Sequence, residues 1–265
     1  MKYLFGFIGC GNMGGALVRA VVKSVSGSAV AVCDHNEGKL AALEADCGVV
    51  REDIRTLAME SKFIVLGVKP QVIEDVFSAI KDVLKLRQDV ILITMAAGVS
   101  ADDICRMAGG EYPVIRIMPN TPCMLGEGMV LYTAKRTPSK DTVVFLKSFQ
   151  KAGVFDWVDE EFMDAAGAIS GCGPAFAYAF AEALALGGAE FGLLKEKGVF
   201  YAAQAMIGAG KMLLTGEKPQ ALIEKVCSPG GTTLAGMSAL EKGNFMGTAK
   251  SAVEAAYART KELQK

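Results

Sequence analysis

Residues 4–14 have the sequence Leu4-Phe5-Gly6-Phe7-Ile8-Gly9-Cys10-Gly11-Asn12-Met13-Gly14, which carries the strongest structural signal in the chain. The apolar run that ends at Ile8 predicts a buried strand, and apolar residues at helical spacing follow as far as Val21. Between the strand and the helix lies a G-x-G-x-x-G motif. In that context the first glycine permits a tight turn, the second lets the backbone approach a pyrophosphate, and the third packs the helix against the strand. The first N–H groups of the helix then bind the phosphates. The segment therefore predicts a dinucleotide site, against the simpler alternative of an ordinary glycine-rich turn.

Segments typical of strands and of helices alternate from this motif to about residue 160. Continuous apolar or β-branched runs predict further strands at 29–33, 63–68, 90–95, 114–118, 129–132 and 154–158. Leu40 and Leu43 predict a short helix after the second strand, and Ser100-Ala101-Asp102-Asp103 has the form of a capping box at the start of another. This alternation predicts an α/β fold with a doubly wound, mainly parallel sheet of the Rossmann type.

The sequence changes character after about Asp159. From Phe162 onward there is no convincing strand, and long segments rich in Ala, Leu and Met are separated by Gly, Pro and Ser. We therefore expect a dinucleotide-binding domain over residues 1–160 and an all-helical domain over residues 161–265. The helix that begins near Ala175 is apolar almost all round, so its outer face needs cover, which a second subunit would supply.

The composition narrows the classes of function. There are 28 Lys and Arg against 29 Asp and Glu, so the formal net charge is −1, and a nucleic-acid-binding protein, which needs a basic face, is not expected. Apolar residues make up 51% of the chain, which excludes disorder. The single histidine leaves no basis for most zinc sites or histidine-based acid–base mechanisms, and we expect no metal.

Cysteine usage and hydropathy predict a cytoplasmic protein without a membrane partner. The seven cysteines are scattered without C-x-x-C spacing, which is typical of reduced thiols. The N-terminus has no signal-peptide pattern. The most lipid-like stretch, 175–194, carries Glu182 and Glu190, so we expect a buried or interfacial helix in place of a membrane span.

Asp34 ends the second predicted strand, twenty residues after Gly14. An acid at this place hydrogen-bonds the adenine ribose 2′-OH and repels a 2′-phosphate, which favours NAD over NADP. The alternative is a solvated acid in a turn. The adjacent His35, the only histidine, lies at the adenosine end of the predicted site and is therefore a poor candidate for proton transfer at the nicotinamide.

Three segments leave predicted strands at the carboxyl edge of the sheet, where open α/β sheets bind ligands. In Val68-Lys69-Pro70, the lysine either lies over the cofactor or is an ordinary loop lysine. The small residues of Ala96-Ala97-Gly98-Val99-Ser100 leave room for a nicotinamide ring. In Arg116-Ile117-Met118-Pro119-Asn120-Thr121-Pro122, Asn120 is held between prolines at the expected edge of the active site.

The helical half contains a second glycine-rich helix start, Ser228-Pro229-Gly230-Gly231-Thr232-Thr233. Backbone N–H groups and hydroxyls at such a place can hold a small carboxylate through the helix N-terminus. The simpler alternative is a helix cap made by a threonine. The residues alone favour neither interpretation.

Taken together, these motifs resemble those of pyrroline-5-carboxylate reductase. The similarity includes the glycine motif, residues 68–70, 96–100 and 118–122, Ser170-Gly171-Cys172-Gly173-Pro174 and, most specifically, Ser228–Thr233, in register over nearly the whole chain. The resemblance implies that NAD(P)H reduces 1-pyrroline-5-carboxylate, a cyclic imino acid, to L-proline in the final step of proline biosynthesis. It also implies a homodimer built by intertwined helical domains, often assembled further into decamers.

With the motifs, the resemblance implies roles for individual residues. The residues expected to contact the cofactor are Ile8, Gly9, Cys10, Gly11, Asn12, Met13, Gly14, Asp34, Val68, Lys69, Pro70 and Ala97. Those expected to bind the substrate are Asn120, Ser228, Gly230, Gly231, Thr232 and Thr233. Thr233 is also the expected catalytic residue, because its hydroxyl would lie near the ring nitrogen. Two positions depart from the family pattern. Asp34 stands where many relatives have a small hydroxyl residue, and Ile54 stands near the position where many relatives have an asparagine that helps to hold the adenosine, which isoleucine cannot do.

The implied reaction suits a chain with so few acid–base groups. A protonated cyclic imine is already electrophilic at carbon, so hydride addition needs no proton from a side chain, and positioning carries most of the catalysis. A β-hydroxyacid dehydrogenase is a rival of the same architecture, but it needs a lysine on the first helix of the helical domain, and residues 170–191 contain none. A non-catalytic dinucleotide sensor is a second rival, which would have no use for Ser228–Thr233.

Overall fold

The structure, a computed structural model, describes residues 1–263 and divides the chain into two compact units. The sheet unit comprises Met1–Cys172 and the C-terminal stretch from Ala256, and the helical unit is Gly173–Ala255. These units are defined by packing alone. The functional division expected at residue 160 stays a prediction.

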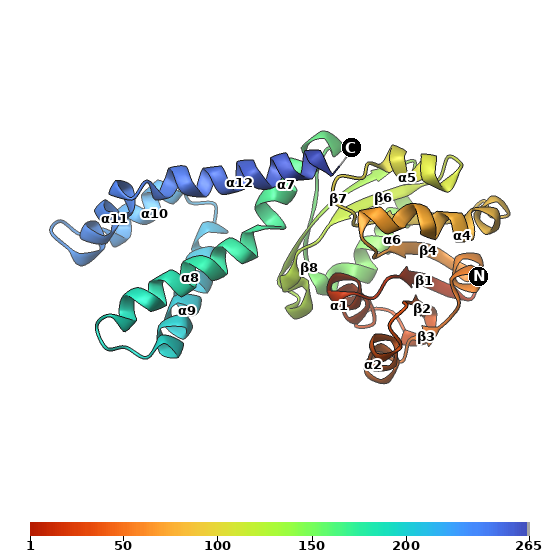
Figure 1. Cartoon of the computed structure of the whole chain (residues 1–265), viewed down its shortest axis with the longest axis horizontal. Helices are drawn as coiled ribbons and strands as arrows, with labels where there is room; N and C mark the ends of the chain where they lie inside the picture. The colour runs from red at the N-terminus through yellow and green to blue at the C-terminus, as the bar shows by residue number, and fades with distance from the viewer. Residues whose placement is uncertain (264–265) are drawn as a thin grey trace. The chain divides into compact units, whose positions relative to one another are not determined.

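An eight-stranded sheet forms the centre of the sheet unit (Figure 1). Its strands are β1 (Tyr3–Ile8), β2 (Val30–Cys33), β3 (Val50–Arg51), β4 (Ser61–Leu66), β5 (Ile91–Thr94), β6 (Val114–Met118), β7 (Gly128–Lys135) and β8 (Gly153–Trp157). They lie in the order β3-β2-β1-β4-β5-β6-β7-β8, and each pair is parallel except the antiparallel pair β6 and β7. The chain therefore winds outward from β1 in both directions, which confirms the predicted doubly wound Rossmann-type sheet.

Helices cover both faces of this sheet, because successive side chains of a strand point to opposite faces. Phe5, Phe7 and Phe63 belong to the core under one set of helices, whereas Ile64 and Leu66 belong to the core under the other. The first set is α1 (Asn12–Val21), α2 (Glu37–Cys47) and α6 (Ser139–Phe149), and the second is α3 (Ile54–Glu60), α4 (Ile73–Lys85) and α5 (Ala101–Ala108). α7 (Met163–Ser170) follows β8 in the same unit. Burial on both faces explains why these strands are continuous apolar runs.

The helical unit contains α8 (Gly173–Ala189), α9 (Lys195–Leu213), α10 (Pro219–Val226), α11 (Thr232–Lys242) and most of α12 (Phe245–Glu262). α8 and α9 pack so closely that a Cβ added to Gly198 would lie 2.9 Å from the Cα of Ala185. The last residues of α12 belong to the sheet unit. Beyond Trp157 the described residues form helices and turns, so the expectation that strands end there is confirmed.

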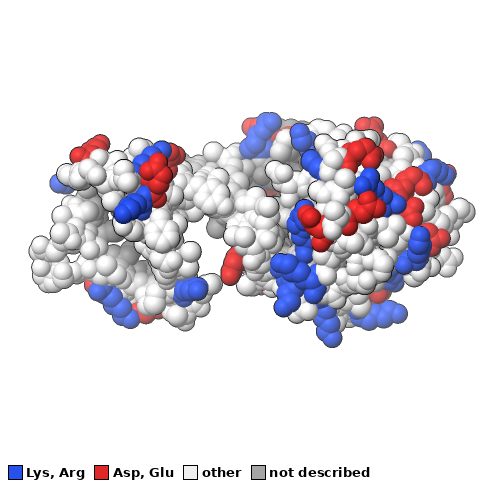
Figure 2. Space-filling model, turned by 90° about the horizontal axis from the view of Figure 1, so that it is seen from below, with Lys and Arg blue, Asp and Glu red and all other residues white. Residues whose placement is uncertain are grey.

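The helical unit buries very little of its apolar surface within one chain. Its buried hydrophobic residues in the described structure are Ala181, Ala185 and Ala202. Large apolar side chains are exposed instead, among them Phe191 at 91% and Leu214 at 87%. In Figure 2, wide areas of this unit's surface carry neither acidic nor basic side chains, while Lys and Arg lie among Asp and Glu over the sheet unit. Exposed apolar side chains gathered in this way on one unit mark an interaction surface.

One helical stretch of the described residues, Glu160–Ala189, is long and apolar enough to cross a membrane by length and composition. Only 11% of its most apolar 18-residue segment is buried. The stretch is interrupted, because α7 ends at Ser170 and α8 begins at Gly173. It also begins with acidic residues, including the buried Asp164. A second subunit would cover this apolar surface as well as lipid would.

The structure also contains elements that the sequence pattern did not predict. β3 has two residues and α3 has seven, so neither is long enough to show a periodic pattern. β7 runs to Lys135, past the predicted end at residue 132, because the antiparallel pairing with β6 continues to Val114. β4 ends at Leu66, two residues before the predicted end, where the chain turns toward the glycine motif.

Candidate functional site

The three glycines of the motif have three different surroundings in the turn from β1 to α1. Gly9 has φ +93°, and a Cβ there would lie 2.8 Å from the backbone of Gly67. A Cβ on Gly14 would fall on the carbonyl oxygen of Gly9. Gly11 has open space where its Cβ would point. These surroundings fit a tight turn, close helix–strand packing and an open cradle for a pyrophosphate.

The start of α1 is suited to bind the phosphates. Gly11 is the N-cap residue, and no side chain in the described structure caps the helix there. Its first backbone N–H groups therefore remain directed at the open space in front of Gly11, where they and the positive end of the helix dipole attract an anion. The residues present fit a bound dinucleotide.

Asp34 lies just past β2 and braces the glycine turn from the side. Its Oδ2 accepts a hydrogen bond from the backbone N–H of Cys10 at 2.6 Å, and its Oδ1 accepts one from Asn36 at 2.8 Å. The structure thus gives this carboxylate a local role that sequence analysis did not predict, and its contact with the ribose stays a prediction. Burial and the nearby Asp34 raise the pKa of the Cys10 thiol to about 12, so Cys10 is a neutral group. His35 is exposed.

The segment after β4 lies against the glycine turn. Gly67 donates its N–H to the carbonyl of Ile8 at 2.8 Å, and a Cβ added to Gly9 would lie 2.8 Å from Cγ1 of Val68. Pro70 begins a short 3-10 helix, and Lys69, its N-cap residue, is exposed. The structure therefore brings Gly9, Cys10, Asp34 and Val68 together, as the cofactor prediction requires. The contacts of Lys69 and Pro70 with a cofactor stay predictions.

A cavity of about 200 Å³ adjoins the glycine turn between α1 and α2. Cys10, Gly11 and Asn12 line one side of it, and the basic residues Arg19 and Lys39 line another. Arg19 already pairs with Asp46 at 2.7 Å. The cavity beside the glycine turn therefore contains the basic groups of Arg19 and Lys39, in addition to the negative charge that Asp34 places against Cys10.

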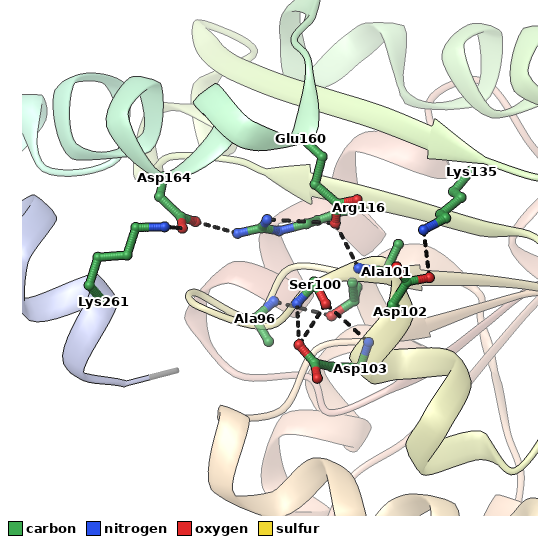
Figure 3. Close-up of polar contacts among 11 residues, drawn as sticks. Ala96, Ser100, Ala101, Asp102, Asp103, Arg116, Lys135, Glu160, Asp164 and Lys261 are labelled. Atoms are coloured by element: carbon green, nitrogen blue, oxygen red, sulfur yellow. Dashed lines mark hydrogen bonds and ion pairs between the residues drawn. The ribbon is translucent and has the colours of Figure 1, made fainter. Parts of the chain in front are cut away.

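The loop between β5 and α5 contains Ala97 and is held at both ends (Figure 3). At the first end, the hydroxyl oxygen of Thr94 accepts a hydrogen bond from the backbone N–H of Ala96 at 3.3 Å. At the other end, the predicted capping box is confirmed, because Ser100 and Asp103 exchange hydrogen bonds between side chain and backbone. Gly98 has φ +74°, which a residue with a side chain rarely adopts. These contacts anchor the loop at both of its ends.

Asn120 is buried and bridges two elements. Its Nδ2 donates to the carbonyl of Ser170 at the end of α7, and its Oδ1 accepts from the N–H of Met129 in β7, both at 3.0 Å. The side chain therefore joins the end of β6 to α7 and β7. Its predicted contact with the substrate stays a prediction, and the bridge is a role that the sequence did not reveal.

A buried ion network lies next to the loop that contains Ala97. Arg116 of β6 is 3% exposed and pairs with Asp164 of α7 at 2.5 Å, and Asp164 also accepts from Nζ of Lys261 at 2.9 Å. Glu160 lies 3.8 Å from Arg116 and accepts the N–H of Ala101 at 2.7 Å. Figure 3 shows these groups in one row. We call Glu160, Arg116, Asp164 and Lys261 the Arg116 network.

The network perturbs the acid–base properties of its members. Burial by itself raises the pKa of Asp164, but the contacts with Lys261 and Arg116 outweigh it, and the pKa lies below the ordinary 3.8. The hydrogen bond to Asp164 raises the pKa of Lys261 above 10.5. Sequence analysis missed this network. The one available signal was an arginine in the middle of an apolar strand, because a buried charge needs a partner.

The segment 228–233 forms a turn into α11 in the helical unit. Ser228 accepts the N–H of Gly231 at 3.0 Å, with Pro229 and Gly230 (φ +72°) between them, which is the pattern of a type II turn. A Cβ on Gly231 would collide with the hydroxyl of Ser228. The turn therefore favours glycine at 230 because of its backbone conformation and at 231 because of the limited space beside Ser228.

The two threonines are free for other contacts. Gly231 is the N-cap residue of α11, no side chain in the described structure caps this helix start, and Thr232 and Thr233 are exposed. The alternative interpretation, a cap made by a threonine hydroxyl, is therefore wrong. Thr233 lines a cavity of about 480 Å³ in the helical unit with Cys227, Lys225 and mainly apolar neighbours.

Other features bear on cofactor and metal chemistry. Among residues 1–263, no group of three His, Cys, Asp or Glu side chains is arranged to hold a metal ion. All seven cysteines are free thiols. In the predicted substrate set, Asn120 belongs to the sheet unit and residues 228–233 belong to the helical unit.

Comparison with known proteins covers both units. The family model "Pyrroline-5-carboxylate reductase dimerisation" matches residues 160–263, and the model "NADP oxidoreductase coenzyme F420-dependent" matches residues 4–98. Pyrroline-5-carboxylate reductase of Pisum sativum is 36% identical over 99% of this chain and 96% of its own length. That of Escherichia coli K12 is 34% identical over 100% of both chains.

A solved structure agrees with these matches. Plasmodium falciparum pyrroline carboxylate reductase, crystallised with NADP bound, superposes with a TM-score of 0.88 at 30% identity over 100% of both chains. A dimerisation domain, together with the exposed apolar surface of the helical unit, identifies the protein as a homo-oligomer. The full-length identity with several reductases, combined with the glycine turn and the Ser228–Thr233 turn, places this chain in the pyrroline-5-carboxylate reductase family.

Proposed function

We propose that this protein reduces 1-pyrroline-5-carboxylate to L-proline with NAD(P)H, the final step of proline biosynthesis. The observation that carries the proposal is similarity to pyrroline-5-carboxylate reductases from one end of the chain to the other, which includes the turn at 228–233. NADP in the related Plasmodium falciparum structure supports a nicotinamide dinucleotide as the cofactor. When bound, the cofactor supplies the hydride.

The sheet unit would hold the cofactor. The turn from Ile8 to Gly14 offers backbone N–H groups to the pyrophosphate, with Gly11 leaving the space that the phosphates need. Val68, Lys69 and Pro70 lie beyond the adjacent strand, and Ala97 lies on the next loop along the sheet. Asp34 and Lys39 stand at the adenosine end with opposite charges, and their balance would set the preference between NADH and NADPH.

The helical unit would hold the substrate. Backbone N–H groups at the start of α11, around Gly231 and Thr232, would bind the carboxylate, because no side chain in the described structure occupies them and the helix dipole favours an anion there. The Thr233 hydroxyl would contact the ring nitrogen and orient the imine. Ser228, Gly230 and Asn120 would complete the set as predicted from the sequence.

No side chain needs to donate a proton in the hydride step. The protonated imine is electrophilic, and hydride addition to its carbon yields the amine directly. The enzyme therefore has to hold the donor and acceptor carbons about 3–3.5 Å apart and exclude water. The absence of histidine from the turn at 228–233 agrees with this chemistry.

We also infer the setting in which the enzyme works. Intertwined helical domains would form a homodimer, with decamers as a further level of assembly, and the substrate-binding and dimerisation domain would span residues 161–265. Seven free thiols favour the cytoplasm. No membrane or nucleic-acid partner is proposed.

The decisive experiment is a steady-state assay of the purified chain. NADPH or NADH is mixed with 1-pyrroline-5-carboxylate, oxidation is followed at the nicotinamide absorbance band, and the product is identified as L-proline. The expected result is oxidation that depends on both enzyme and imine. Oxidation of neither cofactor would contradict the proposal, and turnover with a 3-hydroxy acid and NAD⁺ in its place would favour the dehydrogenase rival.

A further inference from the structure

The loop 95–100 is anchored at both ends to the surroundings of one buried side chain. Thr94, the last residue of β5, lies directly opposite Arg116 in the sheet register. Ala101, the first residue after the loop, donates its N–H to Glu160 at 2.7 Å, and Glu160 lies 3.8 Å from Arg116. The loop therefore starts beside Arg116 and returns to it through Glu160.

Glu160 satisfies a backbone donor that the fold would otherwise leave without a partner. The first N–H groups of a helix have no partner within the helix, and Ala101 is the first residue of α5. Ser100 caps the N–H of Asp103, so Ala101 needs a different acceptor. Glu160 comes from a segment 59 positions further along the chain, which ties the loop to the elements that follow β8.

Arg116 places a positive charge 3.8 Å from Glu160, and Arg116 itself has little freedom. Its side chain is 3% exposed and is held on its other side by Asp164, which is 4% exposed. Asp164 is in turn held by Lys261 near the end of α12. The charge thus alternates along the row Lys261, Asp164, Arg116 and Glu160, and Glu160 accepts the N–H of Ala101 at the end of the loop (Figure 3).

We propose that Glu160 is a positioning residue for the nicotinamide half of the cofactor, acting through the loop that contains Ala97. The inference rests on the proposed function, in which that loop receives the nicotinamide ring. In this role Glu160 acts through the backbone of Ala101 and not through a contact of its own with the cofactor. It anchors the end of the loop by accepting the N–H of Ala101, and Arg116 lies within ion-pair distance of its carboxylate.

The test compares two ligands on the full-length chain. NADPH contains the nicotinamide, and 2′-phospho-ADP-ribose lacks it but keeps the rest of the molecule. Glu160→Ala removes the acceptor for Ala101 and is expected to raise the Kd for NADPH roughly three- to tenfold, because a partly exposed charged hydrogen bond is lost. The Kd for 2′-phospho-ADP-ribose should stay within about twofold of wild type, because the glycine turn is unchanged.

Two further variants make the test specific. Glu160→Gln keeps an acceptor oxygen for Ala101 and is expected to bind NADPH more tightly than Glu160→Ala. Glu161→Ala removes the exposed neighbouring carboxylate and should bind both ligands as the wild type does. In steady-state assays, Glu160→Ala should raise KM for NADPH and leave KM for the imine unchanged.

The proposal is wrong if Glu160→Ala binds NADPH as tightly as wild type, if both ligands weaken together, or if Gln is no better than Ala. Both Kd values are measured without the imine. A chain that binds NADPH but does not reduce 1-pyrroline-5-carboxylate would therefore contradict the proposed function and leave this result intact.

Discussion

The three glycines of the first turn show how single residues divide the work of a dinucleotide site. A methyl group at Gly14 would meet the backbone of Gly9, so that glycine is needed for folding. A methyl group at Gly11 would meet open space, and φ at Gly11 is −63°, which alanine adopts without strain. Gly11 is therefore needed for the ligand alone.

We predict that Gly11→Ala folds normally and loses the cofactor. Its Tm should match the wild type, while the Kd for NADPH should rise at least about tenfold, because the added methyl group occupies the phosphate cradle. Gly14→Ala should lower the Tm by several degrees as its Cβ displaces the turn. Thermal melts and NADPH titrations on both variants check this. Equal NADPH affinity in Gly11→Ala and wild type would contradict the placement of the pyrophosphate.

Asp34 both accepts a hydrogen bond from Cys10 and carries a negative charge, and two substitutions separate these two roles. Asp34→Asn keeps an oxygen for the N–H of Cys10 and removes the negative charge. We expect kcat/KM for NADPH to rise about tenfold relative to NADH, because repulsion of the 2′-phosphate is lost. Asp34→Ser is too short to reach Cys10 and should also lower the Tm. If the cofactor ratio does not change in the Asn variant, Asp34 does not face the 2′-phosphate.

Thr233 is the residue on which the substrate half of the proposal most depends. Thr233→Val keeps the shape and removes the hydroxyl, a loss of about 0.5–1.5 kcal/mol for a neutral partner and up to about 3 for a charged one. The kcat/KM for the imine should therefore fall by a factor between several-fold and a hundredfold, and the affinity for the cofactor should not change. Loss of a helix cap would instead lower the Tm by about 2–4 °C.

The structure and a matched variant sharpen this prediction. No side chain in the described structure caps α11, so the Tm of Thr233→Val should stay near that of the wild type. Thr248→Val, at an exposed threonine of the same unit, is the control and should leave both quantities unchanged. A lower Tm with an unchanged kcat/KM would show that Thr233 supports the helix and not the reaction.

At the scale of elements, the sequence predicts what has a local cause. The apolar runs, the glycine motif and the capping box at Ser100 each lie within a few residues, and the structure confirms the strands and the box. β3 was missed because two residues carry no period. The Arg116 network was missed because residues in direct contact within it lie up to 97 positions apart and meet only after folding.

The bridging role of Asn120 has the same explanation. The sequence indicates a polar residue held between prolines at the edge of the sheet, but its partners on α7 and β7 depend on how those elements pack. For Asp34 the position was predictable and the hydrogen bond to Cys10 was not, because it requires the distance between two loops. Sequence locates functional segments, and tertiary packing decides what each side chain holds.

The end of α12 is attached to α7 by an ion pair whose pH dependence follows from its two pKa values. The raised pKa of Lys261 means that its contribution to stability is complete below pH 10.5 and is lost as the pH rises through the higher folded value. The lowered pKa of Asp164 means that its contribution is complete above pH 3.8 and is lost as the pH falls through the lower folded value. Among the described residues, Arg116 contacts Asp164 and Tyr257 lies beside Lys261, while Glu160 lies on the other side of Arg116.

We predict that Lys261→Met lowers the Tm by a constant amount from pH 5 to pH 9. The difference from wild type should begin to shrink above about pH 10.5, where the lysine of the unfolded chain loses its charge, and should vanish once the pH exceeds the higher pKa of the folded lysine. Lys250→Met, on the same helix and paired in the described structure with the exposed Glu254, is the control and should change the Tm little. A Lys261→Met difference that persists undiminished at pH 11.5 would contradict the assignment of the alkaline change to this pair.

At the scale of the whole molecule, a single chain leaves the apolar surface of its helical unit without a covering partner in the described structure. The helical unit exposes large apolar side chains over most of its helices, whereas the sheet unit has a core on both faces of its sheet. Hydrophobic burial supplies most of the free energy of folding, so a unit whose buried hydrophobic residues in the described structure are three alanines needs a partner surface. Folding of this unit and assembly are therefore expected to be one process.

We predict a mass in solution of twice the 27.9 kDa chain or a multiple of that, and a Tm that falls on dilution. Leu186→Glu places a charge on α8 where the side chain is 50% exposed in one chain, and it should shift the mass toward the monomer and lower the Tm. Leu86→Glu makes the same change at a side chain of the sheet unit that is 76% exposed, and it should alter neither. Light scattering and thermal melts at two concentrations measure both effects. A wild-type monomer with a Tm independent of concentration would mean that the apolar surface of α8 is covered by something other than a second copy of this chain.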